Sequence, residues 1–161
     1  MRYQTISEYF YKFFSVLFLI VLVPLGAFVY LYGAAQLGAV NHPLAGSDTS
    51  DFVVYGLAGI CALDWIAATV YFSKSLRGIR TLVSLGDRLD RYYRLTITRF
   101  AWVGGGLLGL SVGFYLVGDQ LLTALFMVSI LVLGFVWPFP AKISRDLGLK
   151  ESERRVLYDR K

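Results

Sequence analysis

Asp64 is the residue of this sequence whose type and position point most directly to chemistry. It lies near the middle of the apolar run GICALDWIAATVYF, residues 59–72. If that run crosses a bilayer, a charged side chain at its centre costs roughly 2.5–3.5 kcal/mol on insertion scales. We therefore expect Asp64 to face the interior of a helix bundle, either protonated or with polar partners. Two interpretations stay open: a proton or cation site, and a neutral, hydrogen-bonded group that fixes helix packing.

The depth of Asp64 predicts which polar groups could meet it. Ser129 lies at a matching depth in the last apolar run, and the two residues form the predicted intramembrane polar site. The backbone near Gly109 and the Ile20 carbonyl, which Pro24 leaves without its backbone donor, lie at the same level. No lysine or arginine falls at that depth. A single acid with no polar path beside it favours the structural interpretation over proton transfer.

The polar segment NHPLAGSDTSD, residues 41–51, holds the other side chains that could form a catalytic or metal site. They are His42, Ser47, Asp48, Ser50 and Asp51. The segment lacks a nucleophile-elbow or paired-histidine motif, and the chain has one histidine and one cysteine. We therefore expect no enzyme, no metal site and no cofactor.

Long uncharged runs indicate that the elements positioning these residues are transmembrane helices. Of the 161 residues, 57% are hydrophobic, above the roughly 45–50% typical of soluble domains. Each run is about as long as the roughly 20-residue helix that spans a bilayer core. The expected spans are residues 11–34, 53–73, 98–117 and 121–139. We predict an all-α, polytopic membrane protein, a single domain over residues 1–161 folded as a four-transmembrane-helix bundle.

The distribution of positive charge predicts the orientation of these spans. All 16 lysines and arginines fall near the N-terminus, between Lys74 and Arg99, or from Lys142 onward. The other two connections hold Asp48, Asp51 and Asp119 and no basic residue. By the positive-inside rule, both termini, the connector at residues 74–97 and the tail at residues 140–161 lie in the cytoplasm.

The connector is predicted to be helical, either as a hairpin that extends the second and third spans or lying in the interface. Gly86 is the expected turn, with Asp87 starting the next helix. Four arginines share one side of its helical projection, where each contact with an anionic lipid headgroup is worth about 1 kcal/mol. They are Arg77, Arg80, Arg88 and Arg91. Because topology and lipid explain a basic face beside a membrane, we expect no nucleic-acid binding.

Small residues recur every four positions in the third predicted span. They are Ala101, Gly105, Gly109 and Gly113, within the stretch AWVGGGLLGLSVGF. Such a strip lets helix backbones approach closely, and in lipid no hydrophobic force replaces that contact. The strip is predicted to pack against another helix of the same chain, with contact between copies of the chain as the alternative.

Three stretches in the second half of the chain carry a resemblance to a known family. They are RLDRYYRLTITRFAWVGGG, the turn LVGDQLL, and WPFPAKISRDLGLKESE. From about Leu85 to its end the chain resembles a family of short four-span bacterial inner-membrane proteins. That family often has an acidic residue early in the third span, where this chain has Gly104–Gly106. The resemblance implies a topology and an inner-membrane location and implies no chemistry.

These observations predict a small integral inner-membrane protein that acts through helix packing as an accessory, scaffolding or complex subunit. Its expected partners are the lipid bilayer and either a second copy or another membrane protein. The alternative function is a small proton- or cation-linked transporter or channel that uses Asp64.

Overall fold

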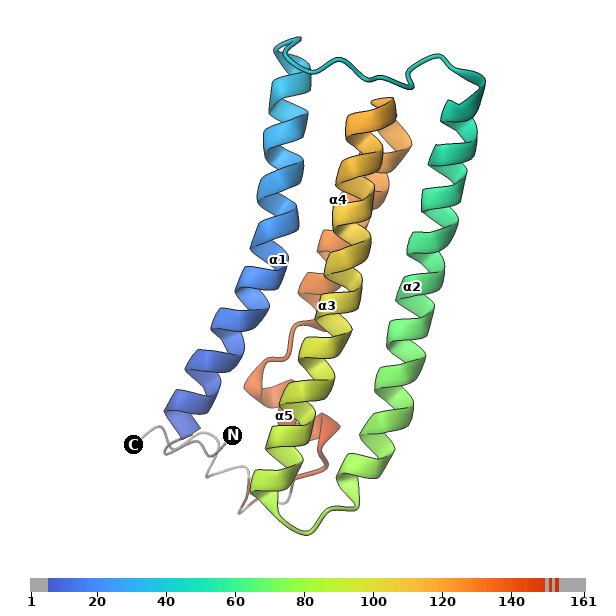
Figure 1. Cartoon of the computed structure of the whole chain (residues 1–161). Coiled ribbons are helices and arrows are strands. Elements are labelled where there is room, and N and C mark those ends of the chain that lie inside the picture. The colour runs from blue at the N-terminus through green and yellow to red at the C-terminus, as the bar shows by residue number, and fades with distance from the viewer. Residues whose placement is uncertain (1–5, 150, 152, 154–161) are drawn as a thin grey trace.

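The computed structural model describes residues 6–149, 151 and 153. These residues form helices with short connections and contain no strand, so the protein is all-α. The helices are α1 (Ile6–Gln36), α2 (Asp48–Arg80), α3 (Leu85–Val117), α4 (Gln120–Val136) and α5 (Pro140–Asp146). Figure 1 shows α1 to α4 running along a common axis, with α5 near the end that holds the α2–α3 turn.

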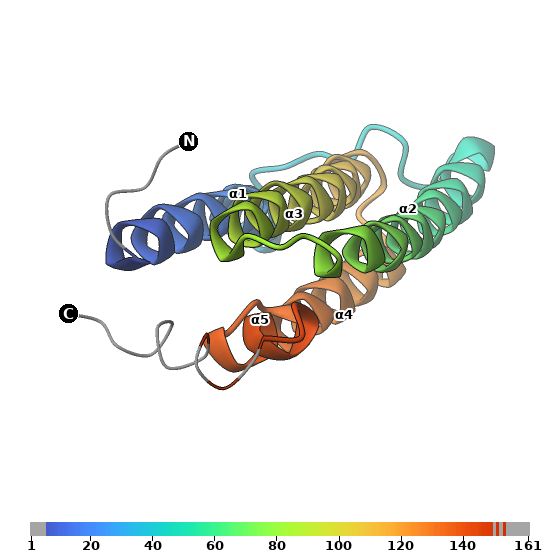
Figure 2. The same ribbon diagram turned by 90° about the horizontal axis from the view of Figure 1, so that it is seen from below.

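The helix α3 lies at the centre of this arrangement. It contacts α1, α2 and α4, and Figure 2 shows it between α1 and α2, with α4 below. Buried side chains occur along almost its whole length, from Leu89 to Val117. The glycine-rich sequence of α3 therefore belongs to a central helix that has neighbours on three sides.

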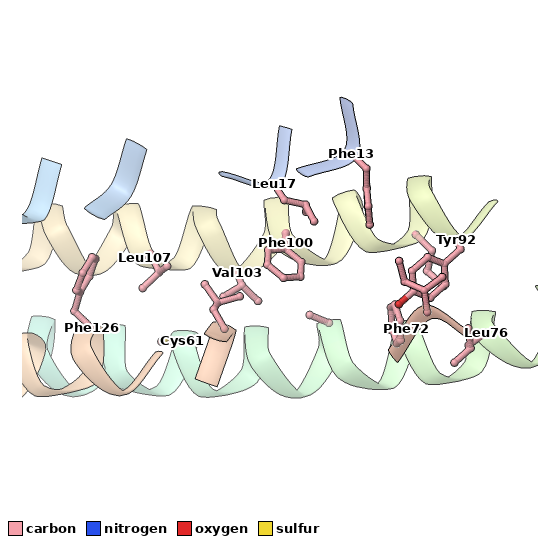
Figure 3. Close-up of a cluster of buried hydrophobic side chains, with 14 of the residues drawn as sticks. Phe13, Leu17, Cys61, Phe72, Leu76, Tyr92, Phe100, Val103, Leu107 and Phe126 are labelled. Atoms are coloured by element: carbon pink, nitrogen blue, oxygen red, sulfur yellow. The ribbon is translucent and has the colours of Figure 1, made fainter. Parts of the chain in front are cut away.

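Aromatic side chains fill much of the space between the helices. The rings of Phe28 in α1 and Phe126 in α4 stack with their centroids 4.0 Å apart. Near the other end, Phe72 of α2 meets Tyr92 of α3 edge-on at 6.0 Å. Figure 3 shows this second cluster, with Phe13 of α1 approaching α3 from the opposite side. These contacts fix the positions of α1, α2 and α4 around α3.

The α2–α3 connection is a helical hairpin, one of the two arrangements predicted for it. The helix α2 continues to Arg80, and α3 begins at Leu85. The turn therefore lies at residues 81–84, and the prediction of a turn at Gly86 is wrong because Gly86 is inside α3. Thr81 closes the end of α2 by donating its hydroxyl to the Gly78 carbonyl at 2.8 Å.

The fourth predicted span is shorter and more bent than the sequence indicated. The helix α4 ends at Val136, and Trp137 has an extended backbone because it precedes Pro138. The chain then enters α5 with Pro140 in its first turn. The axes of α4 and α5 differ by 73°, so the expected straight helix over residues 121–139 is replaced by a bent pair.

The outward faces of the long helices carry large exposed apolar side chains. These include Phe18, Leu22 and Val29 on α1, Ile60, Leu63 and Ile66 on α2, and Met127, Leu131 and Phe135 on α4. Soluble monomers rarely expose contiguous apolar patches above a few hundred Å². Each of α1, α2 and α3 is long and apolar enough to cross a membrane, and the bent pair α4–α5 gives a fourth candidate.

Candidate functional site

A groove between α2 and α3 contains the acid that the sequence singles out. We call it the α2–α3 groove. It has a volume of about 490 Å³, and its walls include Leu57, Ile60, Asp64, Ala101, Gly105 and Gly109. Toward the end of the bundle that holds the α3–α4 turn it continues as a second apolar hollow of about 440 Å³, which shares Leu57, Ile60 and Gly109 with the first. Small residues on α3 form the floor of the groove, since they leave the space that larger side chains would fill.

The three consecutive glycines of α3 face three different surroundings. A Cβ on Gly104 would lie 3.0 Å from Cγ2 of Ile20 in α1, and one on Gly106 would lie 3.1 Å from Oδ2 of Asp64 in α2. A Cβ on Gly105 would have no neighbour within 4 Å. Gly104 and Gly106 therefore permit the close approach of two helices, whereas Gly105 opens into the groove.

The small-residue strip of α3 packs closely at one position only. A Cβ on Gly113 would collide with Leu57, and Gly113 is buried. Ala101 is exposed, and neither Gly105 nor Gly109 would bring a Cβ within 4 Å of another residue. The close packing within the chain that the four-residue spacing predicted is thus confined to Gly113. The other members line an open surface.

The Asp64 carboxylate lies against Gly106 on the wall of this groove. Its side chain is half-buried, and no described residue donates a hydrogen bond to it. Apart from the Cys61 thiol and the Trp102 indole, the groove is lined by apolar or small side chains. An acceptor-only group in a largely apolar groove therefore lacks a donor within the described part of the chain.

Ser129 is not the partner of Asp64. Its hydroxyl accepts a hydrogen bond from Trp65 Nε1 at 3.4 Å and lies 3.9 Å from Cys61 Sγ. Cys61 and Trp65 are four residues apart and both reach Ser129 of α4. Cys61 also borders the groove, while Asp64 meets Gly106 of α3. Matching depth identified the correct level of the bundle, but the rotation of α2 separates the two predicted members of the site.

A buried polar cluster at the other end of α3 escaped the sequence analysis. Tyr92 and Arg99 are both buried, and Tyr92 donates a hydrogen bond to the Asp146 carboxylate of α5 at 3.1 Å. Burial, together with the charge of Asp146, raises the pKa of Tyr92 above its ordinary value. The i, i+4, i+7 spacing of Tyr92, Thr96 and Arg99 was the available signal, because it places three polar groups on one helix face.

The four arginines predicted to contact lipid headgroups divide into two pairs. Arg77 and Arg91 are exposed and free to meet such groups. Arg80 donates through Nε to the Asp146 backbone carbonyl at 2.6 Å. Arg88 is half-buried and forms an ion pair with Glu153 at 3.6 Å. The second pair therefore also ties α5 and the following segment to the hairpin.

Residues of the polar segment between α1 and α2 make hydrogen bonds that hold the segment in place. His42 Nδ1 lies 3.0 Å from the Tyr115 carbonyl, so its other ring nitrogen is the acceptor in the neutral form. Ser47 donates to the Leu44 carbonyl at 2.8 Å, and Leu44 N–H donates to the Leu116 carbonyl at 2.9 Å. Among the described residues no group of three or more His, Cys, Asp or Glu side chains is placed to hold a metal ion.

Comparison with family models, curated proteins and solved structures gives no match to this chain.

Proposed function

We propose that the chain spans the bacterial inner membrane four times, with both termini and the α2–α3 turn in the cytoplasm. The exposed apolar faces of α1 to α4 support insertion, because water would solvate them poorly. The bent pair α4–α5 serves as the fourth span, with α5 in the inner interface. The charge asymmetry between the two ends of the bundle supports the orientation. The resemblance of the second half of the chain supports the bacterial location.

This topology predicts a clear difference between two introduced cysteines. Ala45→Cys should react with a membrane-impermeant thiol reagent in intact cells, whereas Ser84→Cys should react only after permeabilisation. Both native side chains are exposed, and the native Cys61 is buried and gives little background. Reaction at Ser84 in intact cells would contradict the orientation.

Within that membrane, we propose that the protein is an accessory subunit that holds a transmembrane helix of a partner protein in the α2–α3 groove. The observation that carries this proposal is the Asp64 carboxylate, which faces an open, small-residue groove without a donor in the described chain. Small residues favour close helix approach in lipid, and a polar side chain on the partner helix supplies the missing hydrogen bond.

The shape of the groove favours a single helix over a second copy of this chain. A two-fold contact centred on the groove would place one concave groove against the other, whereas the convex surface of a single helix fills one groove. A helix seated between α2 and α3 contacts Gly105 and Gly109 directly, because no described residue covers them. Its polar donor lies at the depth of Asp64 and is a lysine, arginine, serine or threonine side chain.

Proton or cation transport through Asp64 is the second candidate function. The exposure of the carboxylate to the groove favours it, since a transported ion must reach the acid. The lining of the groove opposes it, because apart from the Cys61 thiol and the Trp102 indole its residues are apolar or glycine and offer no continuous path of hydrogen bonds. The same carboxylate is therefore better matched to a fixed partner than to a moving ion.

Variants of Asp64 separate the two candidates. In mild detergent, Asp64→Leu should reduce the amount of a co-purifying membrane protein about tenfold, because a hydrogen bond to a charged group contributes roughly 1.5–3 kcal/mol. Asp64→Asn keeps an acceptor oxygen and should retain more of the partner than Asp64→Leu. Equal recovery with both variants and wild type would contradict the subunit proposal. Flux of protons through vesicles that hold the pure chain, abolished by Asp64→Asn, would establish transport instead.

A further inference from the structure

Arg99 is a buried cation with few partners. Its exposed fraction is 8%, and its guanidinium donates one hydrogen bond, to Thr69 Oγ1 at 3.3 Å. The same group lies 4.8 Å from the centroid of the Phe72 ring. A guanidinium has five N–H donors, and no described carboxylate forms an ion pair with Arg99. Most of its hydrogen-bonding capacity is therefore unused.

Lys142 brings a second cation to the same region. It lies in α5 and donates to the Val136 carbonyl at the end of α4, at 2.8 Å. Burial lowers the pKa of the Lys142 ammonium, Asp146 opposes this shift, and the charges of Arg99 and Arg145 add to it. Lys142 shares a face of α5 with Asp146, four residues later, and Asp146 accepts the Tyr92 hydroxyl two helical turns before Arg99 on α3. The fold therefore brings Lys142 toward Arg99.

The charges of this region do not balance. Asp146 is the described acid that acts on both Arg99 and Lys142, and its carboxylate already accepts the Tyr92 hydroxyl. The buried Thr96 hydroxyl lies beside the Tyr92 hydroxyl. A buried guanidinium is normally paired with an anion, and Asp146 is shared among Tyr92, Arg99 and Lys142, so the cluster can accept a further anion.

The position of the cluster indicates the source of that anion. Thr69, the hydrogen-bond partner of Arg99, is exposed on α2, and Lys142 lies just past the bend where α4 ends. Phe135 and Phe139, on either side of this bend, are 85% and 58% exposed. In the proposed topology this is the inner headgroup layer, with apolar side chains facing the acyl chains.

We propose that Arg99 and Lys142 bind the phosphate of an inner-leaflet phospholipid, whose acyl chains lie along the exposed apolar face of α4. A phosphate accepts charge-assisted hydrogen bonds from both side chains and neutralises the excess charge between them. The inference rests on the proposed membrane placement and is independent of the α2–α3 groove.

Thermal unfolding of the full chain in detergent, followed by tryptophan fluorescence, tests this site. Added dioleoylphosphatidylglycerol should raise the unfolding midpoint by about 5 °C at saturation. Dioleoylglycerol has the same chains without the phosphate and should have no effect. Lys142→Met should lose at least half of the shift, whereas Lys74→Met, the same change at an exposed lysine of α2, should keep it.

Two results would overturn the proposal. The first is that dioleoylglycerol raises the unfolding midpoint as much as dioleoylphosphatidylglycerol does, and the second is that the phospholipid raises it equally for Lys142→Met and wild type. An equal shift from inorganic phosphate alone would exclude the lipid as the source of the anion. If Lys142→Met does not fold, native mass spectrometry of wild type and Arg99→Gln gives the answer. Phosphatidylglycerol should remain bound to wild type and be lost from Arg99→Gln, and equal retention would refute the site. Loss of the α2–α3 partner changes none of these readouts.

Discussion

Leucine at Gly104 should lower the stability of the bundle strongly, while leucine at the adjacent Gly105 should leave it nearly unchanged. A Cβ at Gly104 already approaches Ile20 Cγ2 to 3.0 Å and the Ile20 carbonyl oxygen to 3.4 Å. The three further side-chain carbons of leucine would then fit only if α1 moved away from α3. Overpacking of this kind costs typically 1–3 kcal/mol, and we expect a loss of about 3 kcal/mol because backbone lies on both sides of the contact.

Gly105→Leu is the matched control for this change. The position lies in the same helix, is exposed, and has no neighbour within 4 Å of a Cβ. Replacing glycine in a helix interior even favours the helix by up to about 1 kcal/mol. Thermal unfolding in detergent should therefore separate the two variants by about 10 °C. Equal losses at Gly104 and Gly105 would show that α1 does not pack on α3 through Gly104.

This pair of residues also shows where sequence reasoning reaches its limit. A four-residue spacing of small side chains identifies a smooth helix face, and that face exists in α3. It does not reveal which neighbour covers the face. Glycine at 104, 105 and 106 leaves space on three sides of α3, and the sequence does not distinguish these sides. In the structure α1 occupies the side of Gly104 and α2 the side of Gly106.

Helix positions were more predictable than helix rotations. The uncharged runs located α1 to α3 because burial in lipid requires long apolar segments, and Pro138 and Pro140 marked the end of α4 to within three residues. Asp64 and Ser129 are at the same depth, yet α2 is rotated so that Trp65 meets Ser129. Rotation depends on the summed packing of many side chains, which a single sequence does not display.

The polar cluster of Arg99 was hidden by a different cause. In the sequence, Arg99 lies at the edge of a predicted span, and its charge contributes only to the predicted orientation of the chain. Arg99 lies against Thr69 and Phe72 of α2, and α5 folds back after the bend and brings Asp146 to the neighbouring Tyr92. The sequence shows that two prolines end α4, but it does not show where the chain goes next.

The second large effect concerns the α2–α3 groove itself. A photoreactive amino acid at Ile60, on the wall of the groove, should form a covalent product with one membrane protein in intact cells. The same amino acid at Ile66 should not, although the two positions are 62% and 60% exposed and lie in the same helix. Ile66 is outside the groove lining and, six residues from Ile60, projects from another side of α2, so a helix seated between α2 and α3 does not reach it.

Crosslinking from Ile60 in the presence of Gly105→Leu is the measurement that tests the proposed subunit function most directly. Leucine at Gly105 fills the groove without disturbing the fold, since none of the residues that the structure describes occupies that space. We predict that the product formed from Ile60 disappears in this variant and persists when Gly59→Leu, an exposed glycine with equally free surroundings, is used instead. A product that survives Gly105→Leu, that forms equally from Ile66, or that has twice the mass of this chain would contradict a partner helix in the groove.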